Sequence, residues 1–369
     1  MKEKMENIEK KNLIIAGVFI VSIIIILFGG ALIYNKFFYK KSYSEVETIM
    51  LNAAKSHFKK HEDKLPQNIN DTITLTDDTL VKNEEMNSIA SYLKDDDNSC
   101  TGEVTVTNIN GDYRYTAMLD CGEVYKSENF MDYVKENVSV VTSGDGLYEL
   151  NDELVYRGEN VNNYIKLGGK TYRIVKFTDG RPVIIYTDKS SSTEWDDRYN
   201  TEKEENTGIN NYEVSRMRDY LNSLYENNGE DAILTKSARL LVTQYDLAIG
   251  KRNDSDTDKT GATEKAKVLT EQYIGLLPIS DFLNASLDAN CTNTVSKSCS
   301  NYNYLSKYKY TWWTITASSE NTYRVYRIND EASDANASST AYVRPVFYLA
   351  KDAIYVSGDG SKANPFIIK

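Results

Sequence analysis

The chain has 369 residues, a net charge of −11 and 28 tyrosines. Seven Lys and three Glu give residues 1–41 a charge of +4, so the remainder carries −15. A folded part this acidic lacks the electrostatic footprint of a nucleic-acid-binding protein, and we exclude that class. The length predicts two folded units in addition to the N-terminal segment described below.

The chain contains only two histidines, His57 and His61, and none from residue 62 to 369. This excludes a Ser-His-Asp triad, a Cys-His pair and a histidine zinc site from the main body. The i, i+4 spacing of the pair suits a metal clip, but the neighbouring Lys59 and Lys60 favour a solvated helix face. We therefore predict no catalytic residue, no cofactor and no metal site.

An uncharged apolar segment occupies residues 13–34. As a helix its 22 residues would be about 33 Å long, enough to cross a bilayer core of about 30 Å. Its apolar core is too long for a signal peptide, and no small-x-small cleavage site follows at residues 34–39. We expect an uncleaved signal anchor with residues 1–12 as a cytoplasmic tail. The flanking lysines are nearly balanced and do not fix its orientation.

The next segment, residues 35–65, has the apolar periodicity of an amphipathic helix. Val46, Ile49, Met50 and Ala53 recur at helical spacing, and Pro66 ends the pattern. We expect this segment to continue the membrane helix as a stalk that carries a small β head over residues 66–142.

This layout resembles type IV pilins and pseudopilins over residues 10–140. Prepilins carry a Gly before their cleavage point and a Glu at the fifth mature position. Here Lys10-Lys11-Asn12-Leu13 runs into an uncharged stretch that has neither residue. We therefore expect the segment to remain uncut.

A β-hairpin is predicted between Cys100 and Cys121. Asn110-Gly111 is the strongest two-residue hairpin turn signal, and pairing outward from it places the two cysteines opposite each other. They fall on a non-hydrogen-bonded pair, where Cα atoms about 4.5 Å apart suit a disulfide. The pattern predicts a Cys100–Cys121 bridge.

The other two cysteines, Cys291 and Cys299, bracket a short polar loop and are expected to form a second bridge. Two bridges indicate an oxidising, extracytoplasmic compartment. We expect the protein to be a single-pass cell-membrane protein with residues 35–369 outside.

Residues 143–369 form the second predicted unit. A Ser-Gly-Asp-Gly sequence at 143–146 and again at 357–360 suggests that the ends of this unit lie close together. Expected strands cover 164–167, 170–177, 182–186, 274–280, 312–316, 323–328 and 343–349, and expected helices cover 213–225 and 281–286.

Several motifs in this unit resemble the C-type-lectin-like and formylglycine-generating-enzyme folds. The resemblance implies an extracytoplasmic module of a fold that hosts enzymes, adhesins and receptor-binding proteins. The late cysteine pair of the oxidases is missing, and so are the Glu-Pro-Asn and Trp-Asn-Asp signatures of calcium-dependent lectins. The matching residues are Leu277, Pro278, Phe282, Trp312, Trp313, Val325, Tyr326, Val343, Arg344, Pro345 and Leu349.

The best recognition candidate follows the second cysteine pair, because tyrosine rings and asparagine amides can stack on and bond to sugars or a partner's backbone. Arg344 is expected either to pair with a buried carboxylate or to hold a ligand. The alternating carboxylates of residues 254–258 allow weak calcium binding, but the EF-hand Gly and Glu positions hold Lys259 and Lys265. The candidate ligand-binding residues are Asn301, Tyr302, Asn303, Tyr304, Tyr308, Tyr310 and Arg344.

The expected fold class is α+β: a transmembrane helix extended into a stalk helix, a small antiparallel β head, and a mixed α+β C-type-lectin-like domain. The expected function is a membrane-tethered, non-catalytic binding or structural protein that recognises a protein or a glycan. Two alternatives remain open: a pseudopilin-like subunit of a cell-envelope or secretion assembly, and a histidine-independent enzyme on a lectin-like fold.

Overall fold

A computed structural model describes residues 40–93, 99–188, 191–229 and 231–369. The chain divides into two compact units. Unit 1 comprises the described parts of Met1–Glu62, Thr74–Val104 and Ala117–Lys126, and unit 2 comprises Asp63–Ile73, Thr105–Thr116 and the described parts of Ser127–Lys369. Each unit is described by itself below.

Helix α2 (Tyr43–Lys60) is the longest described helix and forms the core of unit 1. It begins at a capping box, in which the Ser42 side chain accepts a hydrogen bond from the Glu45 amide while Glu45 accepts one from the Ser42 amide. Its apolar stripe is buried, with Val46, Met50 and Ala54 fully inaccessible to solvent.

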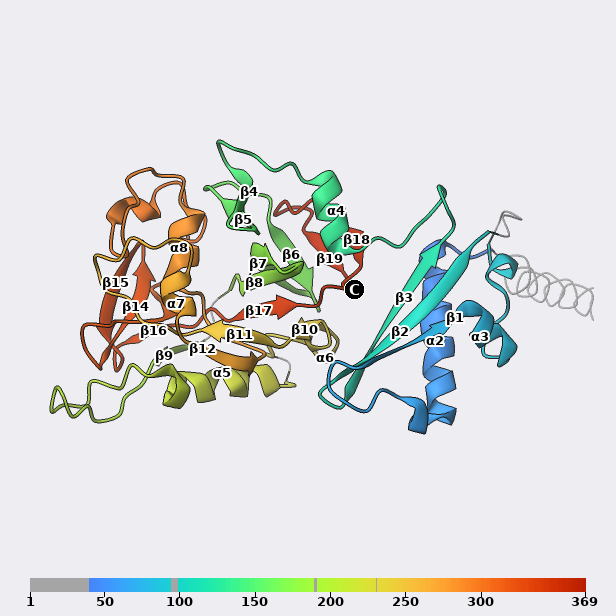
Figure 1. Ribbon diagram of the computed structural model, residues 1–369, viewed down its shortest axis with the longest axis horizontal. Coiled ribbons are helices and arrows are strands. Elements are labelled where there is room, and N and C mark those ends of the chain that lie inside the picture. Colours follow the sequence, from blue (N-terminus) through green and yellow to red (C-terminus); the bar gives the residue numbers. More distant parts are fainter. Residues whose placement is uncertain (1–39, 94–98, 189–190, 230) are drawn as a thin grey trace, which may run out of the picture. The chain divides into compact units, whose positions relative to one another are not determined.

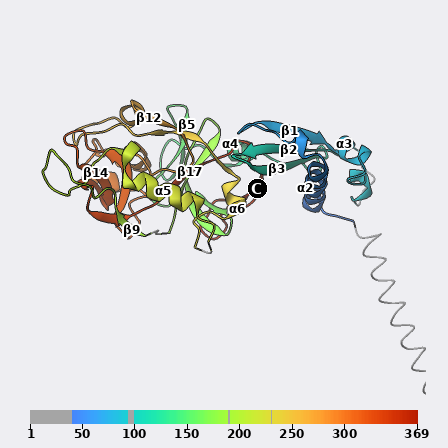
Figure 2. The same ribbon diagram turned by 90° about the horizontal axis from the view of Figure 1, so that it is seen from below.

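The stripe of α2 packs on a three-stranded sheet of order β1-β2-β3 (Figures 1 and 2). The strands are β1 (Thr72–Thr76), β2 (Thr101–Ile109) and β3 (Asp112–Asp120). A Cβ added at Gly102 would lie 2.4 Å from Cε of Met50, so a side chain here would displace the flexible end of Met50 on the buried face of α2. Short helices α3 (Asp77–Lys82), η1 (Glu62–Lys64) and η2 (Ile89–Ser91) complete this region.

The predicted hairpin is confirmed. Asn110 and Gly111 alone separate β2 from β3, and both have positive φ angles of 52° and 88°, as a type I′ turn requires. At the open end of the hairpin Cys100 and Cys121 form a disulfide, with Cα atoms 4.1 Å apart.

Unit 2 contains a nine-stranded sheet, in which β10-β17-β8-β7-β6-β19-β18 lie side by side while β5 pairs with β7 and β4 with β5. The meander expected from 164 to 186 is confirmed as β6, β7 and β8. The bounds are β4 (Gly146–Leu150), β5 (Glu153–Arg157), β6 (Tyr164–Leu167), β7 (Lys170–Thr178), β8 (Arg181–Tyr186), β10 (Val242–Thr243), β17 (Val346–Leu349), β18 (Tyr355–Ser357) and β19 (Phe366–Ile368).

A five-stranded sheet of order β15-β14-β13-β16-β9 and a two-stranded pair β11-β12 complete the strands of unit 2. The bounds are β9 (Ser192–Glu194), β11 (Tyr245–Ala248), β12 (Val268–Gln272), β13 (Trp312–Ala317), β14 (Arg324–Asn329), β15 (Glu331–Asn336) and β16 (Thr340–Tyr342). The helices are α4 (Phe130–Asn137), α5 (Arg216–Glu226), α6 (Lys236–Arg239), α7 (Ala262–Lys265), α8 (Ile279–Ala285), η3 (Tyr212–Val214) and η4 (Lys297–Ser300).

Helix α8 joins the two large sheets, because it contacts β5 of the nine-stranded sheet and β13 of the five-stranded one (Figure 1). Its Ile279, Phe282 and Leu283 side chains are fully buried. The second disulfide, Cys291–Cys299, follows this helix and is also buried.

Residues 128–130, which precede the predicted second unit, lie beside residues 353–355 near the C-terminal strands. The Phe130 amide donates to the Ala353 carbonyl at 2.8 Å, and the Tyr355 amide donates to the Glu128 carbonyl at 2.9 Å. These bonds join residues more than 200 positions apart, so they attach the segment at the start of α4 to the segment at the start of β18.

The expected fold class is wrong in its balance of elements, although a mixed α+β composition is partly consistent with it. Of the described residues, 33% lie in strands and 22% in helices, so this part of the chain is mostly β. Within that part of the chain, no helix has the length and apolarity needed to cross a bilayer. The segment predicted to do so, residues 13–34, lies outside the described residues.

The expected stalk also differs. Residues 40–42 are not helical, and α2 starts at its own cap and packs into a core instead of continuing an earlier helix. Residues 274–278, expected as a strand, form only a single bridge between Gly275 and Val346, and α8 begins two residues earlier than expected, directly after Pro278. Pro278 has an extended backbone conformation and caps α8, so the helix begins directly after it. The apolar sequence around it resembles a strand and does not show this boundary.

Candidate functional site

A cavity of about 590 Å³ opens beside strands β6, β7 and β8 of unit 2. We call it the Arg344 pocket. Lys170, Asp188 and Lys362 also border it. Its aromatic and cationic walls include Tyr164, Arg173, Tyr304, Lys307, Tyr308 and Arg344.

The β6–β7 hairpin positions the first wall of the pocket. Gly168 and Gly169 form its turn with φ angles of 55° and 82°, which residues with side chains rarely adopt. This turn pairs Tyr164 with Arg173 across the two strands, so both side chains project from the same face. The Arg173 guanidinium carbon accordingly lies 4.4 Å from the centroid of the Tyr164 ring.

Arg173 is held on its second side by Tyr304, whose ring centroid is 4.3 Å from the guanidinium carbon. Its Nε donates to Asn163 Oδ1 at 2.7 Å, and its Nη2 donates to the Val161 carbonyl at 3.1 Å. Burial lowers the pKa of Arg173, against the raising effect of the two tyrosines. Arg173 is thus a fixed cation sandwiched between two aromatic rings.

Arg344 also lines the pocket and is only 3% exposed. Its Nε donates to the Tyr186 carbonyl at 3.2 Å, and its guanidinium carbon lies 4.2 Å from the Tyr308 ring centroid and 5.0 Å from that of Trp312. Within the described part of the chain, Nη1 of Arg344 has no hydrogen-bond partner. A guanidinium cannot act as an acceptor, so this donor needs an acceptor from elsewhere.

Comparison with the other buried cations makes Arg344 exceptional. Four Lys or Arg side chains are buried among the described residues, and three of them contact a carboxylate. No carboxylate of the described chain lies within ion-pair distance of Arg344, so the expected buried partner is not found. The three paired cations are Arg114 with Asp352 at 2.6 Å, Lys176 with Asp281 at 3.0 Å, and Arg252 with Glu264 at 3.0 Å.

The pKa values of Arg344 and Lys176 differ in the same way, because only Lys176 has carboxylate partners among the described residues. Burial lowers the pKa of Arg344 to about 10, and the nearby tyrosines offset this only in part. Burial would also lower the pKa of Lys176, but its carboxylate partners raise it above the ordinary value. The lowered pKa of Arg344 is therefore the signature of a buried charge without a counter-ion.

The hydroxyls of Tyr304 and Tyr308 remain protonated at neutral pH. Burial raises the pKa of both well above the ordinary value, although Arg344 lowers it in part. Tyr304 has a side-chain hydrogen bond with Asn163, whereas the buried Tyr308 hydroxyl has no partner in the described chain. Tyr308 and Nη1 of Arg344 are therefore two buried donors without an acceptor at this site.

The structure separates the seven predicted ligand-binding residues. Asn301 and Tyr302 border a different hollow of about 540 Å³, which also contains Glu159, Asp288 and Asp330. Asn303 is fully buried, and its side chain bonds to backbone groups of the loops around it.

The other four predicted residues come together. Tyr304, Tyr308 and Arg344 line the pocket, and Tyr310 packs against Tyr308 at a centroid distance of 5.8 Å without lining it. The structure therefore brings Arg344, which is distant in sequence, onto the same site as the tyrosine-rich segment.

Sequence reasoning missed Tyr164 and Arg173, and with them Lys170 and Lys362. A signal was available for the first two. Gly168-Gly169 is a two-residue turn signal, and counting outward from it pairs residue 164 with residue 173. Nothing in the sequence linked this hairpin to residues 304–344.

The acidic loop at residues 254–258 surrounds an internal cation. The Arg252 side chain is fully buried and donates through Nη2 to the Asp258 carbonyl at 2.6 Å, while Asp256 lies 3.3 Å from the same nitrogen. Asp254 instead accepts a hydrogen bond from the Tyr326 hydroxyl at 2.8 Å. The described chain contains no group of three or more Asp, Glu, His or Cys arranged to hold a metal ion.

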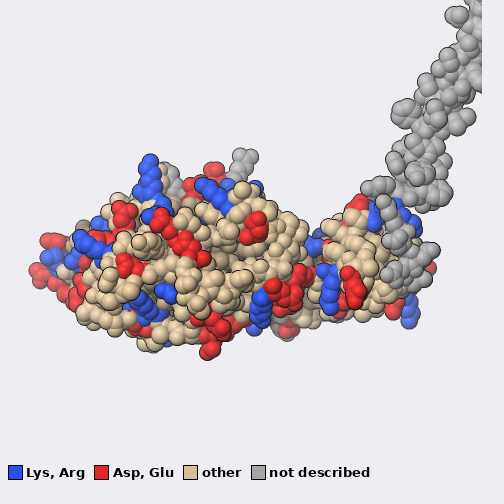
Figure 3. Space-filling view, turned by 90° about the horizontal axis from the view of Figure 1, so that it is seen from above, with Lys and Arg blue, Asp and Glu red and all other residues tan. Residues whose placement is uncertain are grey.

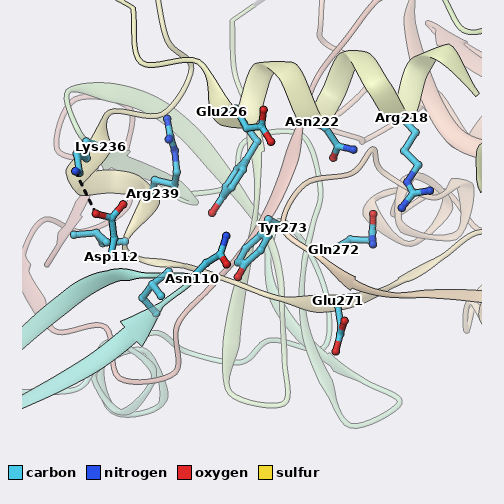
Figure 4. Close-up of a pocket in the computed structure, with 13 residues that line it drawn as sticks. Asn110, Asp112, Arg218, Asn222, Glu226, Lys236, Arg239, Glu271, Gln272 and Tyr273 are labelled. Carbon is cyan, nitrogen blue, oxygen red and sulfur yellow. Dashed lines mark ion pairs between the residues drawn. The ribbon is translucent and has the colours of Figure 1, made fainter. Parts of the chain in front are cut away.

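Another cavity, of about 390 Å³, lies among the turn of the β2–β3 hairpin, helices α5 and α6, and β12 (Figure 4). Its lining carries three cations and three carboxylates, and Lys236 contacts Asp112 at 3.2 Å. Its charges balance, in contrast to those of the Arg344 pocket.

Acidic and basic side chains are interspersed on the face shown in Figure 3. That face has no single basic stripe of the kind that tracks a nucleic-acid backbone. Comparisons with protein families, with curated proteins and with solved structures find no match to this chain.

Proposed function

We propose that the protein is a non-catalytic extracytoplasmic binding protein, attached to the cell membrane through residues 13–34, and that unit 2 binds its ligand in the Arg344 pocket. The observation that carries this proposal is the unpaired, buried guanidinium of Arg344, which lines an open cavity. Buried charges are normally paired, and an exception that borders a cavity is a candidate binding site.

Two further observations support the proposal. The cavity volume lies within the range of about 300–1,000 Å³ typical of small-molecule sites. Both cysteine pairs form disulfides, which persist in oxidising compartments outside the cytosol. A tyrosine-rich wall also suits recognition, since the rings offer contact area with little loss of side-chain freedom.

The proposal is tested by probing arrays of glycans and peptides with the full-length chain in detergent. We expect the wild type to bind a defined set of array features, and Arg344→Gln to lose them. Arg216→Gln is the matched control, because Arg216 is 61% exposed in its side chain and pairs with Asp197 away from the pocket. The proposal fails if the wild type binds no feature, or if Arg344→Gln binds the same features as the wild type.

A further inference from the structure

The unpaired guanidinium of Arg344 and the neighbouring Tyr308 hydroxyl point to the chemistry of the ligand. Nη1 of Arg344 and the Tyr308 hydroxyl are buried donors for which the described chain supplies no acceptor. We infer that the pocket binds a carboxylate carried on a hydroxylated body, such as a sugar acid. This inference rests on the proposed function and assigns the class of its ligand.

A carboxylate fits the number and type of these donors. One guanidinium lacks a counter-ion, and one negative charge neutralises it. The two oxygens of a carboxylate accept hydrogen bonds only, so they can receive both the Arg344 Nη1–H and the Tyr308 O–H. Because Arg344 contacts the Tyr308 ring, these two donors start from adjacent groups.

A phosphate fits less well. At Arg344 one guanidinium supplies the positive charge, so the second charge of a dianion would have to be met by Lys170 or Lys362 of the lining. Arg173 already uses Nε and Nη2 on Asn163 and Val161 and has both faces covered by rings. Lys307, at the rim, already pairs with Glu159 at 3.1 Å.

The rest of the ligand must be polar and larger than a carboxylate. The cavity of about 590 Å³ is far larger than that group alone requires. Its remaining lining includes Lys170, Thr171, Asp188 and Lys362, which offer both donors and acceptors to hydroxyl groups. These side chains do not form the apolar wall that an aliphatic acid would need.

The test compares D-glucuronate with D-glucose, which differ only in a carboxylate in place of a hydroxymethyl group, and adds D-glucose 6-phosphate. Binding to the full-length chain in detergent is measured by titration calorimetry and by saturation-transfer NMR. We expect D-glucuronate to bind at least tenfold tighter than D-glucose. Tyr308→Phe should weaken D-glucuronate binding about tenfold, because it removes one hydrogen bond to a charged group and keeps the ring.

Arg344→Gln should abolish D-glucuronate binding, and Arg216→Gln should leave it unchanged. If Arg344→Gln does not fold, the expected tenfold loss of D-glucuronate binding in Tyr308→Phe serves as the test. Equal binding of D-glucose and D-glucuronate, or tighter binding of D-glucose 6-phosphate, would overturn the carboxylate assignment. If none of the three probes binds while array features still depend on Arg344, the carboxylate inference is wrong and the proposed function stands.

Discussion

Arg252 and Glu264 form an ion pair at 3.0 Å in which neither side chain has any solvent exposure. The same guanidinium also bonds to Thr294 and to backbone carbonyls of the acidic loop at 254–258. An arginine of the chain itself thus occupies the centre of a loop whose carboxylates suggested a metal site. This arrangement leads to the first prediction.

Arg252→Met should destabilise the protein by about 3–5 kcal/mol, because it leaves the buried carboxylate of Glu264 without its partner. Denaturant unfolding followed by fluorescence measures the change. The double variant Arg252→Met/Glu264→Gln should recover part of the loss, since it removes the orphaned charge. A loss below about 1 kcal/mol in the single variant would contradict the assigned role of this pair.

Asp258 should make the protein sensitive to acid. Burial tends to raise its pKa, but hydrogen bonds from Thr263 and Thr260 and the charge of Arg252 hold it at about 2, below its ordinary value. A lowered carboxyl pKa stabilises the fold above the unfolded value of about 3.9, and this contribution is lost as the pH falls toward 2.

Because Asp258 is only partly buried and solvent screens its charge, we expect a contribution of about 1 kcal/mol. The stability difference between wild type and Asp258→Asn should therefore shrink by about that amount between pH 5 and pH 2. Urea midpoints measured across this range provide the test. A difference that stays constant with pH would rule out the role of Asp258.

Two neighbouring residues should respond very differently to truncation. Asn303 is fully buried and donates to the carbonyls of Phe282 and Cys299 while it accepts from the Leu305 amide. Asn303→Ala should cost about 2–4 kcal/mol, because backbone groups lose their partners. Tyr302→Ala should change stability by less than about 0.5 kcal/mol, since that side chain is 60% exposed. Thermal unfolding of both variants distinguishes them, and equal losses would disprove the contrast.

The cysteines test the proposed compartment. A thiol-alkylating reagent applied to intact cells should not label the protein before reduction, and all four cysteines should react after denaturation and reduction. Cys100→Ala/Cys121→Ala should lower stability by about 3 kcal/mol, as expected for a bridge that closes a loop of this length. Labelling of Cys100 and Cys121 in the native protein without reductant would place unit 1 in a reducing compartment.

Removing the N-terminal cap of helix α2 should cause a smaller loss of stability. Ser42→Ala removes the side-chain acceptor of the capping box and should reduce stability by about 1 kcal/mol. Thr48→Ala is a control, since Thr48 lies within the same helix and bonds only to the Ser44 carbonyl one turn before it. The cap has no such role if the two variants melt at the same temperature.

Local structure could be predicted wherever turn chemistry and alternation agreed. Asn110-Gly111 determined the hairpin register and with it the Cys100–Cys121 bridge, because a two-residue turn leaves only one pairing. By contrast, the apolar periodicity before Pro66 predicted a helix but not where it begins. The capping box at Ser42 and Glu45 was present in the sequence, and it separates α2 from the segment before it.

The candidate site was only half predictable. Tyr304 and Tyr308 were recognised from composition, and Arg344 from its motif, but their proximity results from pairing β17 with β8 and from the loop that returns beside β6. Such contacts join residues far apart in sequence, and no local pattern encodes them. The fold class failed for the same reason, since short strands assembled into large sheets leave weaker signals than one long helix.

Arg344 has no carboxylate counter-ion in the described chain, and this should lower the free energy of unfolding of the protein. A residue that keeps an unneutralised charge in the interior weakens the empty protein, so its replacement by an apolar side chain of similar length should do little harm or even raise the melting temperature. Arg344→Met should therefore melt well above Arg252→Met, although both remove a buried arginine. Equal melting temperatures for Arg344→Met and Arg252→Met would contradict this difference between an unpaired and a paired buried arginine.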